Sequence, residues 1–147
     1  LADLGQTVLV VGAASDQDAA DVVKASTPAD VVSLVGQLSL GQLGAVFERC
    51  RLVVANDSGP MHLAVAVGTP VVSIFGPSDP QVYGPYGQSN AVASAGLDCS
   101  PCFRRGRAKD CRDPRCMTSL KVDDVWRVVL AKLERAQQPE VNSPRAR

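Results

Sequence analysis

The sequence predicts an α/β fold in which helices cover both faces of a parallel sheet. Short apolar runs alternate along the chain with segments of helical periodicity, and Gly, Pro, Asn and Asp separate them. The apolar run at residues 52–55 is followed by a short helical segment from Pro60 to Val67 and by a second run at residues 71–75. This order is typical of a parallel β-α-β unit. The pattern therefore indicates a doubly wound parallel sheet.

Five apolar runs are expected to form strands, at residues 7–11, 31–35, 52–55, 71–75 and 91–93. Helices are expected at residues 16–24, 39–50, 60–67 and 122–136. Apolar side chains at helical spacing give these helices an inner face. The expected inner positions of the first, second and last helices are Ala19, Ala20, Val22, Val23, Leu40, Leu43, Val46, Phe47, Val122, Val125, Val129 and Leu133, with Trp126 beside the last group.

Length and charge limit the possible classes of protein. The 147 residues favour one domain, expected over residues 1–136, and residues 137–147 are predicted to be a disordered tail. The formal net charge is zero, but residues 1–98 carry three Lys or Arg against nine Asp or Glu, and residues 99–147 carry twelve against six. No apolar run is long enough to span a bilayer. Because the chain begins with Leu1, it is expected to be a piece of a longer protein.

The turn at residues 56–59 is the first candidate site. Asp57 or Ser58 is expected to cap the following helix, with Pro60 in its first turn. A helix start offers unpaired N–H groups and a partial positive charge, and Gly59 lets a ligand approach the backbone. Ser58 and His62 are four residues apart and so share a helix face. The pattern is typical of a phosphate or diphosphate site, although a plain cap and turn fit it as well.

Two other turns lie at the same predicted edge of the sheet. Gly12-Ala-Ala-Ser-Asp16 follows the first strand and lacks the glycine fingerprint of nicotinamide and flavin sites. Ser15 or Asp16 is expected to cap the following helix. The turn-rich segment at residues 75–80 follows the strand at 71–75, and Ser78 and Asp79 are expected either to line a sugar pocket or to form an ordinary turn.

Four cysteines gather in a loop at residues 99–116, namely Cys99, Cys102, Cys111 and Cys116. Two pairs of thiols can hold zinc tetrahedrally, but the second pair has four intervening residues rather than two. Reduced or redox-labile thiols and two disulfides remain alternatives. The loop is also basic, through Arg104, Arg105, Arg107, Lys109, Arg112 and Arg115. These charges are expected either to form a plain solvated loop or to draw in an anionic donor or a phosphate-rich lipid at a membrane surface. Nucleic acid is disfavoured because only Phe103 interleaves with them.

Several motifs together resemble one known family. They are Asn56-Asp-Ser-Gly-Pro-Met-His62, Gly68-Thr-Pro-Val-Val72, Phe75-Gly-Pro-Ser-Asp-Pro80, Tyr83-Gly-Pro85, Cys99-Ser-Pro-Cys-Phe103 and Cys116-Met117. In this order they resemble the ADP-heptose:lipopolysaccharide heptosyltransferases of glycosyltransferase family 9, from about residue 5 to residue 135. The resemblance implies the C-terminal, Rossmann-like half of a GT-B enzyme, whose N-terminal acceptor domain is absent from this sequence.

The resemblance also implies roles for single residues. The donor would be an ADP-sugar. Its diphosphate would be bound by Ser58, Gly59, Pro60 and Met61, its ribose hydroxyl by Asp16, and its sugar by Ser78 and Asp79. Catalytic roles would fall to His62, at the leaving diphosphate, and to Asp57, which would shape the turn.

The expected function is transfer of heptose to the lipopolysaccharide core by a cytoplasmic enzyme peripheral to the inner membrane. No cofactor is expected for transfer, and a structural zinc is the one possible metal. The fragment alone is expected to be inactive. A non-catalytic nucleotide-binding module and a zinc-stabilised interaction domain are the alternatives.

Overall fold

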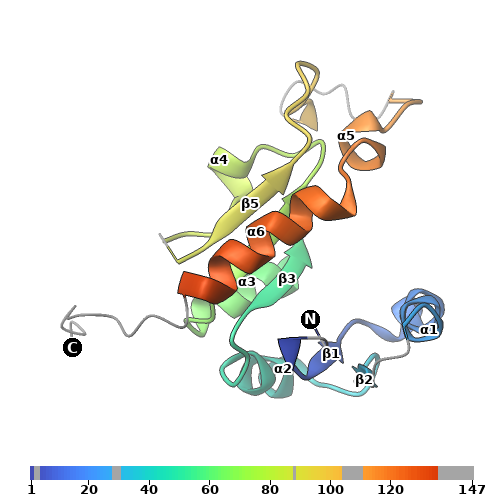
Figure 1. Ribbon diagram of the computed structural model, residues 1–147, viewed down its shortest axis with the longest axis vertical. Helices are drawn as coiled ribbons and strands as arrows, with labels where there is room; N and C mark the ends of the chain where they lie inside the picture. Colours follow the sequence, from blue (N-terminus) through green and yellow to red (C-terminus); the bar gives the residue numbers. More distant parts are fainter. Residues whose placement is uncertain (2–3, 28–30, 88, 104–110, 136–147) are drawn as a thin grey trace. The chain divides into compact units, whose positions relative to one another are not determined.

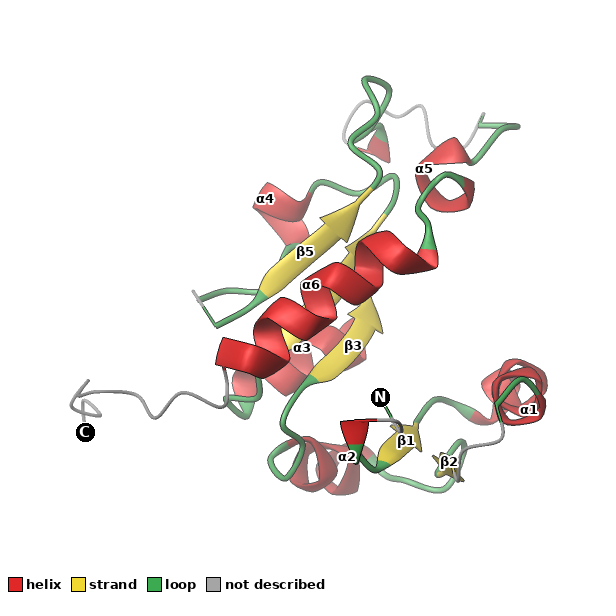
Figure 2. Cartoon of the chain, viewed as in Figure 1, coloured by secondary structure: helices red, strands yellow, loops and turns green. Residues whose placement is uncertain are grey.

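The computed structural model describes residues 1, 4–27, 31–87, 89–103 and 111–135 (Figure 1). They form two compact units, Leu1–Ala45 and Val46–Arg147. Both units contain parallel sheets and helices, which confirms the predicted α/β class (Figure 2). The single domain over residues 1–136 stays a prediction, and the predicted tail at 137–147 lies outside the described residues. Within the described ranges no helix is long and apolar enough to cross a membrane.

The first unit contains a parallel pair of strands, β1 (Val8–Val10) and β2 (Val31–Ser33), with Val8 opposite Val31. A short 3-10 helix, η2, leads into the first α-helix, and a second α-helix begins at the end of the unit. These elements are η2 (Ala14–Asp16), α1 (Gln17–Ala25) and α2 (Leu40–Phe47). Ser39 precedes α2 and exchanges hydrogen bonds with Gln42, a capping box that defines where this helix starts.

Burial in the first unit corrects part of the predicted inner faces. Ala20, Val31 and Val35 are buried, as core positions should be. Val22 is 67% exposed, Leu40 73% and Val23 46%, and Ala19 is exposed as well, so these four are not core residues as predicted. Helical spacing places a side chain on a stripe, but the width of the stripe that is covered depends on what packs there.

The second unit is built on a three-stranded parallel sheet in the order β3-β4-β5. The strands are β3 (Val53–Asn56), β4 (Val71–Phe75) and β5 (Ala91–Ser94). Val71, Val72, Ser73 and Phe75 of the central strand are at most 1% exposed. Successive side chains of a strand point to opposite faces, so burial of neighbours shows that both faces of β4 are covered. The run of β4, which is apolar except for Ser73, is what this cover on both faces favours.

Helices on the two faces provide that cover. The helix α3 (Gly59–Ala66) contacts β3 and β4, and α6 (Val122–Arg135) contacts β4 and β5. Figure 1 shows α6 in front of the sheet and α3 behind it. Val129 and Leu133 pack with Val72 in one apolar cluster, with Trp126 at its border. Val122 is 82% exposed, which corrects its predicted place on the inner face, because it begins the helix beyond the edge of this cluster.

Two short helices follow that the periodicity does not predict. They are α4 (Pro80–Tyr83) and α5 (Arg115–Thr118), each four residues long. One turn of helix cannot show a repeating apolar pattern. Local chemistry starts α4 instead, since the Asp79 carboxylate accepts a hydrogen bond from the Gln81 N–H at 2.9 Å and Pro80 occupies the first turn.

Candidate functional site

The turn between β3 and α3 lies at the carboxyl end of the sheet. The strand ends at Asn56 and the helix begins at Gly59, with Ser58 as its N-cap residue in an extended conformation. The Asp57 N–H donates to the Ile74 carbonyl of β4 at 3.2 Å, so the turn is attached to the neighbouring strand. The carboxyl ends of parallel strands are where open α/β sheets usually bind ligands.

Gly59 leaves the start of α3 open. A Cβ built on this glycine would have no heavy atom within 4 Å beyond its own chain neighbours and the helix backbone. Its φ is not positive, so the glycine is not required by the backbone conformation. The second helical residue, Pro60, has no N–H, so only Gly59 provides a backbone donor among the first two residues of the helix. An anion can therefore reach this amide without meeting a side chain.

The residues around Gly59 divide between solvent and core. The Ser58 hydroxyl donates to the Asn56 carbonyl at 3.1 Å and makes no side-chain cap, so the predicted capping bond is replaced by a turn within the loop. His62 is exposed on the first turn of α3. Met61 is fully buried, and its N–H donates to the Ser58 carbonyl at 3.1 Å. The open side of the helix start thus presents Gly59 and His62, while Met61 anchors the helix in the core.

The other end of α3 is closed by a Schellman motif. Gly68 has a φ of 83°, and its N–H donates to the Val65 carbonyl while the Thr69 N–H donates to Ala64. The buried Thr69 hydroxyl donates to the Phe47 carbonyl at 2.6 Å. Both ends of the helix are therefore fixed, as the predicted Gly68 cap required, and the position of its first turn follows from them.

The loop after β4 contains the predicted pair Ser78 and Asp79. Ser78 is half-buried, whereas Asp79 is only 8% exposed. The Asp79 carboxylate caps α4 through the Gln81 N–H. The ordinary turn role that the sequence allowed for Asp79 is thus present in the structure. Contact of either side chain with a sugar stays a prediction.

Asp16 lies in the first unit and closes its own turn. Its Oδ2 accepts a hydrogen bond from the Ala13 N–H at 2.8 Å, and a Cβ at Gly12 would lie only 2.7 Å from the same oxygen. Gly12 is therefore needed to give the carboxylate room. The local role in ordering the η2 turn is observed, and contact of Asp16 with a ribose stays a prediction.

The four loop cysteines are free thiols that differ in exposure. Cys116 is buried, Cys102 is half-buried, and Cys99 and Cys111 are exposed. Burial raises the pKa of the Cys116 thiol above its ordinary value of 9.0, and charge on Cys102, Cys111 and Cys99 raises it further. Each of the other three thiols therefore lies within electrostatic reach of Cys116. Among the residues that the structure describes, no group of three or more His, Cys, Asp or Glu is arranged to hold a metal ion.

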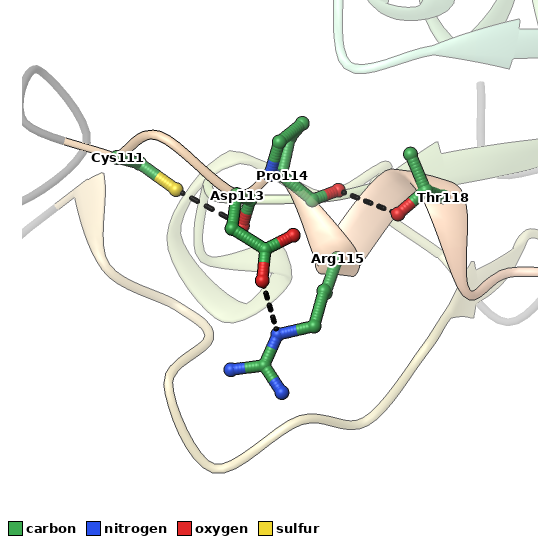
Figure 3. Close-up of polar contacts among 5 residues, drawn as sticks. All are labelled: Cys111, Asp113, Pro114, Arg115 and Thr118. Carbon is green, nitrogen blue, oxygen red and sulfur yellow. Dashed lines mark hydrogen bonds and ion pairs between the residues drawn. The ribbon is translucent and has the colours of Figure 1, made fainter.

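Exposed polar contacts order the start of α5, as Figure 3 shows. The Cys111 thiol donates to the Asp113 carbonyl at 3.3 Å, and Arg115 Nε lies 2.9 Å from Asp113 Oδ2. Both partners of this ion pair are more than 60% exposed, so it adds little stability. The predicted basic residues Arg104, Arg105, Arg107 and Lys109 lie outside the described residues.

The structure also places the cysteine loop against the loop after β4, a contact that the sequence analysis missed. The N–H groups of Cys102 and Phe103 both donate to the Pro77 carbonyl, each at 2.9 Å. The cysteine loop follows β5 and the loop at Pro77 follows β4, and both strands were predicted. Neighbouring parallel strands end at the same edge of a sheet. That adjacency is the one sequence signal for the contact, and it requires the strand order to be known.

Comparisons with known proteins give consistent results. The sequence profile of glycosyltransferase family 9 (heptosyltransferase) matches residues 1–112. The chain is 34% identical to lipopolysaccharide heptosyltransferase 2 of Escherichia coli K12 over 84 residues, which are 54% of this chain and 24% of that protein. It is 36% identical to lipopolysaccharide heptosyltransferase 1 of Pseudomonas aeruginosa over 73 residues, or 50% and 21% of the two chains.

Two solved structures share the fold. The glycosyl transferase family 9 protein of Veillonella parvula matches with a TM-score of 0.76 at 25% identity, over 90% of this chain and 38% of that one. The E. coli ADP-heptose lps heptosyltransferase II matches with a TM-score of 0.75 at 23% identity, over 92% and 39%. The chain spans about a quarter of the length of the curated relatives it matches.

Proposed function

This chain belongs to glycosyltransferase family 9, the heptosyltransferases, and we propose that it supplies the donor-binding part of an enzyme that transfers heptose from ADP-heptose to the lipopolysaccharide core. The family supports the reaction, and the fold is that of a GT-B glycosyltransferase over part of its length. The observation that carries the proposal is the open helix start at Gly59, which suits a diphosphate.

The diphosphate is proposed to lie against the Gly59 amide, with the Ser58 hydroxyl at its side. The N-terminal charge of α3 stabilises an anion there, and Pro60 keeps the first turn in helical geometry without a competing N–H. Met61 contributes through the core, since its side chain is buried and its amide is already bonded to Ser58.

His62 and Asp57 are the proposed catalytic residues. Sugar transfer leaves a nucleoside diphosphate whose negative charge grows toward the transition state. His62, exposed on the first turn of α3, is proposed to donate a proton or positive charge to that leaving group. Asp57 is half-buried and its N–H is bonded to Ile74, so its part is to shape the turn and orient its neighbours. The helix start then provides the electrostatic stabilisation that a metal provides in other transferases.

The acceptor and the location are also proposals. The lipopolysaccharide core would bind in a part of the full-length protein outside this chain, because the chain spans only about a quarter of its curated relatives. The names of these relatives describe them as lipopolysaccharide or lipooligosaccharide heptosyltransferases. We place the full-length enzyme at the cytoplasmic face of the inner membrane, where the basic segment at residues 104–115 would meet anionic lipid.

Calorimetry tests the donor. ADP and ADP-heptose are titrated into the full-length protein and into this chain, with UDP and NAD as controls. We expect ADP and ADP-heptose to bind, and UDP and NAD to bind at least about tenfold more weakly, a difference of about 1.4 kcal/mol. Equal affinity for all four ligands, or none, would contradict the assignment of an ADP-sugar.

Transfer of radiolabelled heptose to a lipopolysaccharide core acceptor tests the reaction. We expect turnover by the full-length protein and none by this chain alone, because a GT-B site is closed by a second domain. ADP binding by the full-length protein without any transfer would instead indicate a non-catalytic nucleotide-binding module. Turnover by the 147-residue chain would overturn the proposed division of the site.

A structural zinc at Cys99, Cys102, Cys111 and Cys116 is a second proposal, which would make the loop a metal-stabilised interaction element. The spacing of the four thiols along the chain supports it. Zinc would have to draw them together, since the described thiols form no ready ligand set. Elemental analysis of protein purified under reducing conditions should find about one zinc per chain. If the protein is folded but contains no metal, the zinc proposal is wrong and the loop cysteines are reduced thiols.

A further inference from the structure

Two backbone carbonyls after β4 are held by a segment that lies far along the chain. The Pro77 carbonyl accepts the N–H groups of Cys102 and Phe103, both at 2.9 Å. The Ser100 hydroxyl donates to the carbonyl of the preceding residue, Gly76. A carbonyl oxygen has two lone pairs, so Pro77 is fully occupied. These three bonds attach the loop after β4 to residues 100–103.

The helix α5 packs on another side of the same loop. A Cβ at Gly76 would overlap the Met117 sulfur, and would lie 3.1 Å from Met117 Cγ and 3.4 Å from Cys116 Sγ. Gly76 and Cys116 are buried, whereas Met117 is 42% exposed. The thioether of Met117 therefore rests where a side chain at Gly76 would be, a close approach that only glycine permits.

The same strand end is attached to the candidate diphosphate site. Ile74, two residues before Gly76, accepts the Asp57 N–H at 3.2 Å. Asn56 and Ile74 are register partners in the parallel sheet, so both loops leave the sheet at one level. The start of α3 would take the diphosphate, and the loop that begins at Gly76 is the neighbouring loop at that edge. It is therefore placed to meet a group attached to the diphosphate.

We propose that Ser100 and Met117 are positioning residues, which hold the loop at Gly76–Ser78 against the sugar of the donor. The inference rests on the proposed function, and it assigns the bracing segment to sugar placement rather than to nucleotide binding. Neither side chain touches the substrate. They act through Gly76, whose backbone they contact from two sides.

The test uses the full-length protein with ADP and ADP-heptose as probes. In Ser100→Ala and Met117→Ala we expect the affinity for ADP to stay within about twofold, while kcat/KM for ADP-heptose falls about tenfold, because small displacements of a positioning group are costly in catalysis. The loss should appear mainly in kcat, since the sugar is misplaced rather than unbound. Thr118→Ala is the matched control, because Thr118 lies beside Met117 on α5, is exposed, and its hydroxyl donates to the Pro114 carbonyl of its own helix turn.

A double-mutant cycle tests the contact itself. Gly76→Ala should displace the flexible Met117 side chain and reproduce the effect of Met117→Ala. Added to Met117→Ala, it should change kcat/KM by less than about twofold, because residues in contact are not additive. A fall in ADP affinity that matches the fall in turnover would overturn the assignment to the sugar. If Ser100→Ala and Met117→Ala behave like Thr118→Ala, the positioning role of Ser100 and Met117 is wrong. Failure of the proposed function would instead be seen in the wild type, as absence of ADP binding and of transfer.

Discussion

The Asp57 N–H donates to the Ile74 carbonyl at 3.2 Å, so the turn before α3 is hydrogen-bonded directly to the central strand of its sheet. Ile74 continues into the loop that Ser100 and Met117 contact. One strand end thus carries both the proposed diphosphate site and the proposed sugar loop. The relationship makes the two loops separable by mutation, since each has its own anchoring atoms beyond this shared bond.

Gly59→Val should remove nucleotide binding without unfolding the protein. The new side chain enters open space, and the φ of Gly59 is not positive, so no backbone strain arises. Its methyl groups would occupy the place of the diphosphate. We expect ADP affinity to fall at least about tenfold, or about 1.4 kcal/mol, while binding of adenosine is unchanged.

Gly41→Val is the matched control for that variant, because Gly41 also lies in a helix with no atom within 4 Å of a Cβ. Calorimetry and urea unfolding are run on both proteins. If Gly59→Val is folded and binds ADP as tightly as the wild type, the phosphate lies elsewhere.

His62→Ala in the full-length enzyme should lower turnover more than donor affinity. His62 is exposed, so its removal leaves the core intact. Loss of a proton donor or of a charge that acts on the leaving group typically costs about 100-fold or more in kcat. Steady-state kinetics and ADP calorimetry measure the two quantities, and His62→Gln controls for hydrogen bonding alone. Equal losses in kcat and in ADP affinity would assign His62 to ground-state binding instead.

Thr69→Val should destabilise the second unit. The hydroxyl of Thr69 is buried and donates to the Phe47 carbonyl at 2.6 Å, and an isosteric valine would leave that carbonyl with only the Cys50 N–H as donor. The expected cost in the free energy of unfolding is about 0.5–1.5 kcal/mol, the net value of one hydrogen bond. Thr118→Val removes an exposed hydroxyl bond of 3.4 Å and should cost much less. Urea unfolding compares the two, and similar costs would mean that the buried bond contributes no more than a surface one.

Cys116 should make stability depend on pH in the alkaline range. Burial, followed by the charges of Cys102, Cys111 and Cys99, raises the pKa of its thiol above the ordinary value of 9.0. The folded state therefore holds this proton more tightly than the unfolded state does. The contribution to stability is fully present below pH 9.0 and is lost as pH rises through the folded pKa.

Cys116→Ser should flatten this part of the pH profile, which urea unfolding between about pH 7 and pH 10.5 measures. Cys111→Ser should flatten it less, because it leaves the burial of Cys116 in place and removes only one of the three charges that raise its pKa. An unchanged slope in Cys116→Ser would show that the thiol does not titrate differently in the folded and unfolded protein.

Local signals were enough to predict the parallel strands, the helix at the candidate site and its end. Pro60 in the first turn of α3 and Gly68 with positive φ at its end act within a few residues, so the sequence shows them directly. The run from Val71 to Phe75 is apolar except for the buried Ser73, because β4 is covered on both faces, and its bounds were predicted without error. The motifs that resemble the family lie in these same local segments.

Tertiary structure decided what these segments meet. Helical spacing cannot show that Val122 lies beyond the edge of the core, or that the Ser58 hydroxyl bonds to Asn56 rather than to the helix. The contact of Gly76 with Met117 joins positions 41 residues apart, and only the order of β4 and β5 in the sheet brings their loops together. Patterns along a chain record which side chains prefer burial or a turn, whereas packing depends on which distant segments become neighbours.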